Sequence, residues 1–356
     1  MAAHTSTPMD DGVLWDHVLA VMLGAGCLLT AAMAALVLEA VLASAFARSQ
    51  PRATDRNTGP WAGGPVLLEQ GGSEVDGAIV VAVVQGRTGR PTMLVSDESE
   101  AHGTRVRRLR FFYDPQVCGA ELVSNIIQTE MLIREDGTVD RTRLSTHWNR
   151  LIVASLVYAG AARIPLGCAC VLGHGCGALS SFLEEVLLAD VAAVEKDEQV
   201  CDMGRAYFAD SAHVHIDDAA EFVIKSSSSA KFDVVFVDIN AEDDEPMAAP
   251  PASIYAEETS RALSRMSPVV LVNVLPASQT GPDHYQRIED TFARHFPATR
   301  WLHSTLCSNR ILVASAKEYT SMEVLNARMG AWKKLSQALA QSLDGIEYGS
   351  NILPRG

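Results

Sequence analysis

The sequence lacks an excess of basic residues. Its 356 residues include 29 Lys and Arg against 43 Asp and Glu, which gives a formal net charge of −14. Proteins that bind nucleic acid along a broad face usually carry a basic excess. The charge therefore argues against direct contact with nucleic acid and favours small molecules or basic proteins as partners.

Cysteine pairs at metal-binding spacing are also missing. The seven cysteines are scattered, their number is odd and no C-x-x-C occurs, which argues against a disulfide framework and a zinc knuckle and is typical of a reducing compartment. Cys168 and Cys170 share one face of an expected strand, and we expect buried thiols there. His213 and His215 have the same spacing, and we predict no metal site at either pair.

One long apolar run stands apart from the rest of the chain. Val18 to Leu38 holds 21 residues without a charge, and a helix of that length spans about 31 Å, the thickness of a bilayer core. Acidic residues precede the run and arginines follow it, so the positive-inside rule places the C-terminal bulk in the cytosol. Gly and Ala in the run permit close helix packing and with it a homodimer.

We therefore expect a tail (1–17), a transmembrane anchor (18–46) and a linker (47–64) before the folded part. A cleaved signal peptide, a transit peptide and a buried helix are the alternatives for the apolar run. If the segment is absent from the mature protein, we expect a soluble cytoplasmic protein instead.

Residues 65–140 carry β signals. Segments rich in β-branched or aromatic residues are bounded by turn formers, which predicts a small antiparallel β domain. The expected strands are Ala78–Val84, Thr92–Val95, Arg107–Tyr113 and Glu121–Leu132.

Strands and helices alternate over residues 141–320, which predicts a doubly wound α/β sheet with helices on both faces. The expected strands are Cys168–Gly173, Val191–Glu195, Val214–Asp217, Asp233–Asp238, Pro268–Leu275, Arg300–Leu306 and Ile311–Ala314. The expected helices are Arg143–Ala161, Ala178–Leu188, Glu198–Phe208, Ala219–Lys225, Ser253–Arg265 and His284–Phe296, with a last helix, Met322–Leu343, in the tail segment 321–356. The last two strands are too close in sequence for a crossover, so the seven-stranded sheet has one reversed strand.

A glycine-rich loop follows the first of these strands. Gly173-His174-Gly175-Cys176-Gly177-Ala178 opens a helix, where glycines allow a ligand to approach the backbone closely and the helix N-terminus offers N–H groups. The same pattern fits the G-x-G-x-x-A of a nicotinamide enzyme, so the loop alone leaves two ligands open.

Carboxylates end the next three strands, at the edge where open α/β sheets bind ligands. Glu195 can accept both hydroxyls of a ribose, Asp217 or Asp218 can bond an adenine amino group, and Asp238 lies at the floor of the crevice. Asp218 taken alone is equally well explained as the N-cap of the next helix. The set predicts a site for an adenosyl ligand.

In its sheet order, reversed hairpin and strand-end residues the chain resembles the class I methyltransferases, which use S-adenosylmethionine. Within that class it looks like the spermidine-synthase-like branch, and most like the C-terminal domain of the eukaryotic dual (lysine and N-terminus) methyltransferase of elongation factor 1A. The resemblance covers roughly residues 105–345. The stretches that carry it are Arg107–Phe112, Gly119–Glu121, His147-Trp148, the glycine loop, Val194–Asp197, Val214–Asp218, Phe232–Asp238 and Pro250-Pro251.

The resemblance implies roles for individual residues. Gly173, His174 through its backbone, Gly175 and Gly177 would line the methionine and ribose of S-adenosylmethionine, Glu195 would hold the ribose and Asp218 the adenine. Asp238 would lie beside the reacting methyl group, where it can orient an amine or relay its proton, with Asp243 and Asp244 on the next loop as helpers. The implied acceptor is a lysine or an N-terminal amine of a basic protein such as a translation factor, attracted by the acidic stretch between Asp233 and Ser260.

Two positions depart from the polyamine synthases of that branch. Those enzymes carry an aspartate inside the glycine loop, where this chain has Cys176, and another after the fourth strand, where it has Ala241. A diamine would lose its charge partners there, so aminopropyl transfer becomes an alternative. A catalytically silent adenosyl-binding scaffold or assembly factor, small-molecule methylation and nicotinamide chemistry are the others.

Overall fold

The computed structural model describes residues 67–70, 74–75, 78–84, 92–100, 103–112, 123–241, 245, 247–277, 281–317 and 322–344. The chain divides into two units, Met1–Gly64 and Pro65–Gly356, and the described residues belong to the second. The expected tail, anchor and linker lie outside the described residues. Within the described ranges, no helix combines the length and the apolar character needed to cross a membrane.

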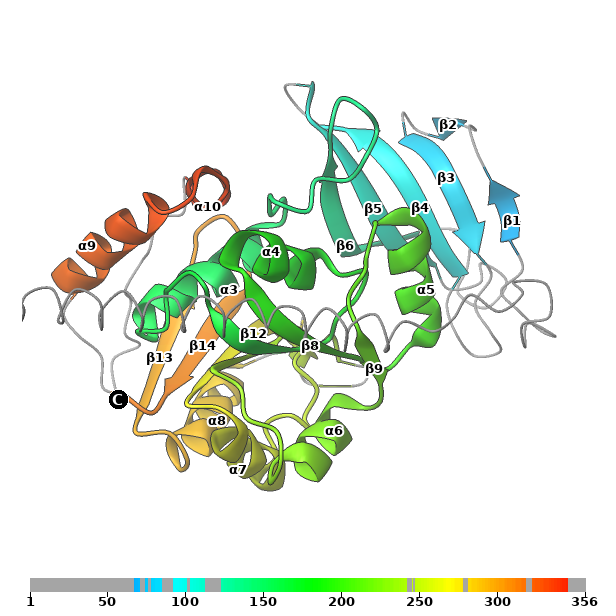
Figure 1. Ribbon diagram of the computed structural model, residues 1–356. Helices are drawn as coiled ribbons and strands as arrows, with labels where there is room; N and C mark the ends of the chain where they lie inside the picture. The colour runs from blue at the N-terminus through cyan, green and yellow to red at the C-terminus, as the bar shows by residue number, and fades with distance from the viewer. Residues whose placement is uncertain are drawn as a thin grey trace, which may run out of the picture. The chain divides into compact units, whose positions relative to one another are not determined.

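A small antiparallel sheet opens the described part of the chain, as the sequence predicts (Figure 1). Its strands are β1 (Leu67–Gln70), β2 (Glu74–Val75), β3 (Ala78–Val84), β4 (Thr92–Ser99), β5 (Arg105–Phe112) and β6 (Val123–Ile133). They pair in the order β1-β3-β4-β5-β6, with β2 beside β3. Alternate residues such as Met93, Val95 and Leu109 are buried in one apolar cluster, which is the pattern of a sheet with one covered face.

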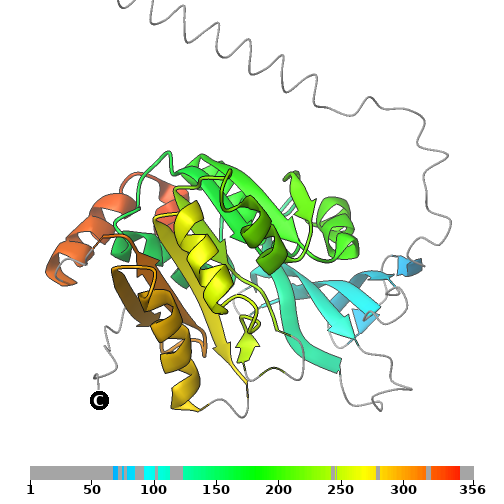
Figure 2. The same cartoon turned by 90° about the horizontal axis from the view of Figure 1, so that it is seen from below.

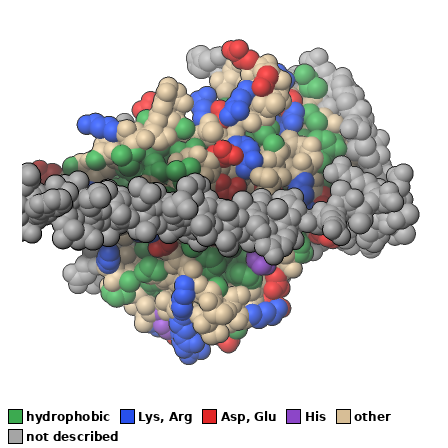
Figure 3. All heavy atoms as spheres, viewed as in Figure 1, with side chains coloured by type: hydrophobic (Ala, Val, Ile, Leu, Met, Phe, Trp, Pro, Cys, Tyr) green, Lys and Arg blue, Asp and Glu red, His purple; other side chains and the backbone are tan. Residues whose placement is uncertain are grey.

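The other face of this sheet is charged. There Arg108 and Arg110 of β5 pair with acids of β4 and β6, and Figure 3 shows acidic and basic side chains interspersed on the visible surface of the region that holds this sheet. On the covered face, in line with Val95 and Leu109, the Arg107 guanidinium binds both carboxylate oxygens of Asp97, at 2.6 and 2.8 Å, and also donates to the Tyr207 carbonyl at 2.8 Å. That last bond ties the small sheet to the rest of the unit.

A Rossmann-like α/β sheet follows. Its strands are β7 (Gly167–Leu172), β8 (Ala189–Glu195), β9 (Val214–Ile216), β10 (Val234–Val237), β11 (Met247–Ala249), β12 (Val269–Pro276), β13 (Ala298–His303) and β14 (Arg310–Ser315). Seven of them pair in the order β13-β14-β12-β10-β7-β8-β9. Strand β14 runs antiparallel to both neighbours and the other pairs along β12-β10-β7-β8-β9 are parallel. The predicted reversed strand is confirmed, while β11, antiparallel to β12, was not expected.

Helices cover both faces of this sheet (Figures 1 and 2). They are α3 (His147–Tyr158), α4 (Ala178–Leu187), α5 (Glu198–Tyr207), α6 (Ala219–Ser226), α7 (Glu257–Met266), α8 (Pro282–Ala293), α9 (Met322–Lys333) and α10 (Gln337–Ser342). Alternate residues of β7 face opposite ways, as strand geometry requires. Ala169 and Val171 join a cluster with α3, α4, α9 and α10, whereas Cys170 and Leu172 join one with α6, α7 and α8.

Several helix boundaries differ from the sequence prediction. Helix α3 begins at His147 rather than Arg143, after an N-cap, Thr146, in extended conformation, and α7 begins at Glu257 rather than Ser253, because a turn occupies residues 252–255. The expected last helix is two helices, α9 and α10. The Ser336 side chain accepts the N–H of Leu339 and starts α10 as its N-cap. The helical periodicity of the sequence therefore continues across a point where the helix is interrupted.

Candidate functional site

The predicted site residues come together at one edge of the large sheet. Strands β10, β7, β8 and β9 are parallel neighbours, so their carboxyl ends lie side by side. The glycine loop follows β7, Glu195 ends β8, Asp217 and Asp218 follow β9, and Asp238 follows β10. One edge therefore carries a backbone cradle and carboxylates from three strands.

The glycine loop has no room for side chains at two of its positions. Gly173 has a φ of +87°, and a Cβ there would lie 2.1 Å from the carbonyl oxygen of Asp238. Gly177 also has a φ of +87°, and a Cβ there would lie 2.6 Å from Oδ1 of Asp210. Both the left-handed backbone and the close approach require glycine.

Every backbone N–H from Gly173 to Gly177 has a partner within the chain. The N–H groups of Gly173 and His174 donate to the Val194 carbonyl at 3.0 and 3.1 Å, and that of Gly177 donates to the His174 carbonyl at 3.1 Å. Gly175 donates to Glu195, and Cys176 to Thr129. The pyrophosphate of a dinucleotide is held by free N–H groups of such a loop. In this chain all five N–H groups of the loop donate to acceptors of the protein itself.

The Glu195 carboxylate is hydrogen-bonded to the glycine loop and to the two residues that follow it in the chain. Its Oε2 accepts the Gly175 N–H at 2.9 Å, while its Oε1 accepts the N–H groups of Lys196 at 2.9 Å and Asp197 at 3.1 Å. The carboxylate that the sequence assigns to a ribose is thus held at the loop by three charge-assisted hydrogen bonds, which are stronger than neutral ones.

Asp218 caps helix α6. Its Oδ1 accepts the N–H groups of Ala220 at 2.9 Å and Glu221 at 3.2 Å, so the N-cap interpretation is the one that the structure shows. Asp217 precedes it, and its Oδ1 accepts the Asp218 N–H at 2.9 Å. Both carboxylates lie at the carboxyl end of β9, at the edge that carries the glycine loop.

Asp238 belongs to a chain of polar side chains that the sequence did not reveal. Its Oδ1 accepts the Asn273 amide at 2.7 Å, and the Asn309 amide donates to Asn273 at 2.9 Å. The Trp148 side chain also hydrogen-bonds to Asp238. Burial raises the pKa of Asp238 above its usual value, although the bonds from Asn273 and Trp148 oppose this shift. An aspartate whose pKa is raised by burial is a candidate for proton transfer.

His174 faces inward. Its ring nitrogens lie 2.9 Å from the Ser180 hydroxyl and 2.9 Å from Oδ2 of Asp210, and all three side chains are buried. The His174 side chain therefore anchors the loop to α4 and to the segment after α5, and it leaves the backbone as the part that a ligand can meet. No sequence signal points to Asp210, since it lies 36 residues further along the chain.

Strand β6 of the small sheet crosses this region. The Thr129 hydroxyl accepts the Cys176 N–H at 3.2 Å, and the Asn240 amide donates to Gln128 at 2.8 Å. Cys176 is buried in the apolar cluster of the small sheet, and burial raises its pKa well above the usual value. The loop position that holds an aspartate in polyamine synthases is therefore occupied here by a neutral, buried thiol.

Other candidates fall outside this constellation. Asp243 and Asp244, the expected helpers, lie outside the described residues. Cys170 is buried as expected, but Cys168 is exposed because it lies near the start of β7, so the prediction of two buried thiols was wrong for Cys168. The rings of His213 and His215 are 5.2 Å apart, and within the described ranges no three His, Cys, Asp or Glu side chains gather as a metal site would require.

Comparison with known proteins gives likenesses of fold. No protein-family model and no curated protein sequence matches the chain. The crystal structure of human methyltransferase-like protein 13 in complex with SAH is 17% identical, covering 59% of this chain and 98% of that one, with a TM-score of 0.48. A probable spermidine synthase from Corynebacterium glutamicum is 13% identical over 68% and 83% of the two chains, with a TM-score of 0.46. Spermidine synthase from Thermotoga maritima is 15% identical over 73% and 87%, with a TM-score of 0.44.

Proposed function

We propose that this protein binds S-adenosylmethionine and transfers its methyl group to a protein amine, a lysine or an N-terminus, with Asp238 near the acceptor. The observation that carries the proposal is the edge formed by β10, β7, β8 and β9. There the glycine loop, Glu195, Asp218 and Asp238 come together beside a sheet whose order includes the reversed strand β14.

The residues of this edge fit an adenosyl ligand without phosphates. Glu195 supplies carboxylate oxygens for ribose hydroxyls, Asp218 supplies one for an adenine amino group, and the glycine loop brings its backbone to the same edge. A dinucleotide would need N–H groups of the loop for its pyrophosphate. Because those from Gly173 to Gly177 are bonded within the chain, the site favours S-adenosylmethionine over a nicotinamide cofactor.

The work left to the protein is positioning and proton handling. When bound, S-adenosylmethionine supplies an electrophilic methyl group on a sulfonium. The protein must hold an uncharged amine in line with that group, and positioning of this kind is worth about 7–11 kcal/mol. An ammonium must first lose its proton, and Asp238, whose pKa is raised by burial, can accept or relay it. The bonds from Asn273 and Trp148 fix the orientation of its carboxylate.

Labelling of a protein extract tests the proposal. The purified full chain is incubated with methyl-labelled S-adenosylmethionine and total protein extract, and labelled protein bands are recorded. We expect bands with the wild type, at least a tenfold loss with Asp238→Asn, and full labelling with Glu221→Gln on the exposed face of α6.

Three outcomes would contradict the catalytic proposal. Bands of equal intensity from wild type and Asp238→Asn would remove Asp238 from the reaction. The absence of any band from a protein that binds the cofactor would favour the scaffold alternative. In a separate assay with decarboxylated S-adenosylmethionine labelled in its aminopropyl group, label on a polyamine would favour the spermidine-synthase alternative, although the buried Cys176 offers no carboxylate for a diamine.

A further inference from the structure

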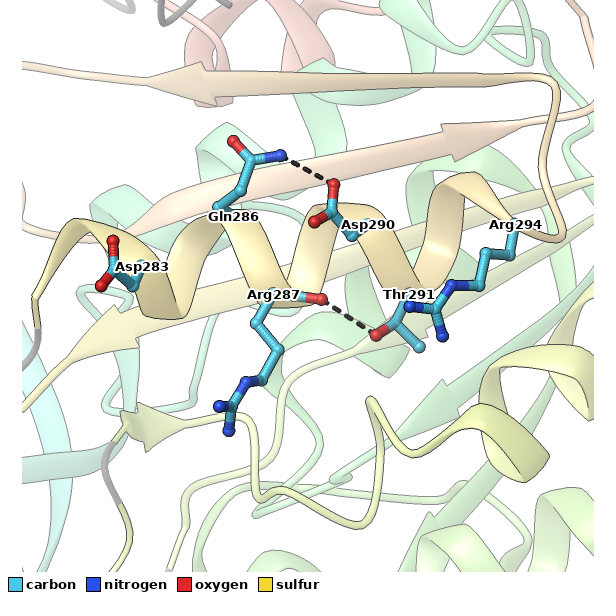
Figure 4. Close-up of a pocket in the computed structure, with 6 residues that line it drawn as sticks. All are labelled: Asp283, Gln286, Arg287, Asp290, Thr291 and Arg294. Atoms are coloured by element: carbon cyan, nitrogen blue, oxygen red, sulfur yellow. Dashed lines mark hydrogen bonds between the residues drawn. The ribbon is translucent and has the colours of Figure 1, made fainter. Parts of the chain in front are cut away.

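A cavity of about 460 Å³ opens beside the candidate site, between α8 and the β13–β14 hairpin. Cavities of 300–1,000 Å³ with aromatic walls and a few polar groups are typical of small-ligand sites. The other described cavity, of about 360 Å³, is a different case: its side chains lie along α8 (Figure 4), mix acids with bases, and include the Gln286–Asp290 and Arg287–Thr291 hydrogen bonds.

An aromatic wall and a cation define the first cavity. The rings of Tyr285 and Trp301 meet edge to face with centroids 5.6 Å apart, and the guanidinium carbon of Arg310 lies 4.3 Å from the Tyr285 ring centre. Both aromatic residues are mostly buried. Stacking on Tyr285 orients the planar guanidinium and leaves its N–H edge for a partner.

The cavity is positively charged. No Asp or Glu is among its lining residues, and Arg310 forms no ion pair with a carboxylate of the described residues. Glu289 of α8 has both carboxylate oxygens in hydrogen bonds to β13: one accepts the Trp301 indole N–H at 2.9 Å and the other the Thr299 hydroxyl at 3.1 Å. An arginine with an open fork matches a carboxylate.

Hydrogen bonds connect this cavity to Asp238. Asn309, which lines the cavity, donates to Asn273, and Asn273 donates to Asp238. Helix α3 makes a second connection, because His147 hydrogen-bonds to the cavity residue Ser304 at 2.8 Å while its neighbour Trp148 bonds to Asp238. Two groups of side chains, Asn309 with Asn273 and His147 with Trp148, therefore connect the cavity to Asp238.

We infer that this cavity receives a carboxylate of the methyl acceptor, with Arg310 as its anchor and the Tyr285–Trp301 wall against its carbon skeleton. The inference rests on the methyl transfer of the proposed function and describes its acceptor further: the amine presented near Asp238 belongs to a group that also carries a nearby carboxylate. An acidic side chain close to the methylated amine of a protein and the α-carboxylate of a free amino acid share this chemistry.

A binding experiment without cofactor tests the cavity directly. Phenylacetate and its neutral isostere phenylacetamide are titrated onto the full chain, with binding followed by saturation-transfer NMR. We expect wild type to bind phenylacetate at least fivefold more tightly than phenylacetamide, and Arg310→Gln to lose this preference. Arg310→Lys, which keeps the charge, should retain part of it, and Arg287→Gln, an exposed arginine of α8 outside the cavity, should retain all of it.

The inference is overturned if the two probes bind equally or if Arg310→Gln keeps the preference. A second arm identifies the source of the carboxylate by following the methyl label into free amino acids and into extract proteins. Label in free amino acids assigns the α-carboxylate, label on a protein amine flanked by Asp or Glu assigns a side chain, and label on amines without such a neighbour contradicts the inference. Since the probe titration contains no cofactor, it can fail while S-adenosylmethionine still binds.

Discussion

Oε2 of Glu195 lies 2.9 Å from the backbone nitrogen of Gly175, so the end of β8 holds the glycine loop after β7 in place. Glu195→Gln keeps one oxygen as acceptor but loses the charge and one of the two acceptors. Hydrogen bonds to charged groups contribute about 1.5–3 kcal/mol, so we expect affinity for S-adenosylmethionine to fall roughly tenfold to hundredfold.

Calorimetric titration checks this expectation against Glu221→Gln. Glu221 is an exposed acid of α6 whose recorded ion-pair partner is Lys225, and its replacement should leave cofactor affinity unchanged. If Glu195→Gln binds the cofactor as tightly as wild type, Glu195 has no part in the ligand site.

Gly173 and Gly330 provide a matched pair of alanine substitutions. In Gly173→Ala the new Cβ would meet the Asp238 backbone oxygen at 2.1 Å in a left-handed conformation, so we expect loss of the native fold or of cofactor binding. Gly330 lies exposed within α9 with open space around it, and Gly330→Ala should stabilise the protein by about 0.5–1 kcal/mol. Urea unfolding and calorimetry measure both effects, and a Gly173→Ala protein of normal stability and affinity would contradict this account of the loop.

Asp210 anchors the loop through His174, and its replacement should cost stability. Asp210→Asn keeps the shape but exchanges an acceptor facing the imidazole for an amide, and leaving a buried polar group without its partner costs about 1–3 kcal/mol. Urea unfolding at pH 7 should show this loss. Glu221→Gln, which breaks an exposed i,i+4 pair, should change the unfolding free energy by about 0.5 kcal/mol or less. Equal changes in unfolding free energy for the two substitutions would show that the buried His174–Asp210 contact stabilises the fold no more than an exposed ion pair does.

Glu98, on the charged face of the small sheet, should make the stability of the fold depend on pH in the acid range. Burial raises its pKa, but hydrogen bonds from Arg110, Ser96 and Arg108 outweigh burial and lower the pKa from 4.5 to about 2. A carboxyl group whose pKa is lower in the folded state stabilises the fold above its unfolded pKa, and this contribution disappears as the pH falls from about 4.5 towards 2.

Comparison of wild type with Glu98→Gln isolates this contribution. At pH 7 the variant should unfold more easily by about 1.5–3 kcal/mol, the value of hydrogen bonds to a charged group. The difference should stay constant down to about pH 5 and then shrink as the pH approaches 2. A difference that is independent of pH between 5 and 2 would contradict the lowered pKa.

The sequence predicts the layers of this fold better than its boundaries. The alternation of apolar runs with helical periodicity predicts the large sheet, and the short gap between β13 and β14 forces the reversed strand. The short strand β11 leaves no such signal, because three residues beside acidic positions carry no period. The break between α9 and α10 is equally hidden, since only the cap at Ser336 interrupts a continuous pattern.

The sequence likewise predicts one part of the candidate site and not another. Strand ends predict the convergence of the glycine loop, Glu195, Asp218 and Asp238, because parallel strands place their carboxyl ends together. Partners contributed by distant segments are invisible to periodicity. Asn273 on β12, Asn309 before β14 and Asp210 after α5 are polar residues that only the folded chain brings against Asp238 and the loop.

Calorimetric titration of the purified full chain with S-adenosylmethionine and, separately, with NAD tests the central claim most directly. The account predicts binding of S-adenosylmethionine with one site per chain, no binding of NAD, and loss of binding in Gly175→Arg, where an arginine would have to fit beside the Thr129 hydroxyl at a φ of +57°. Binding of NAD alone, or unchanged binding of S-adenosylmethionine by Gly175→Arg, would contradict it.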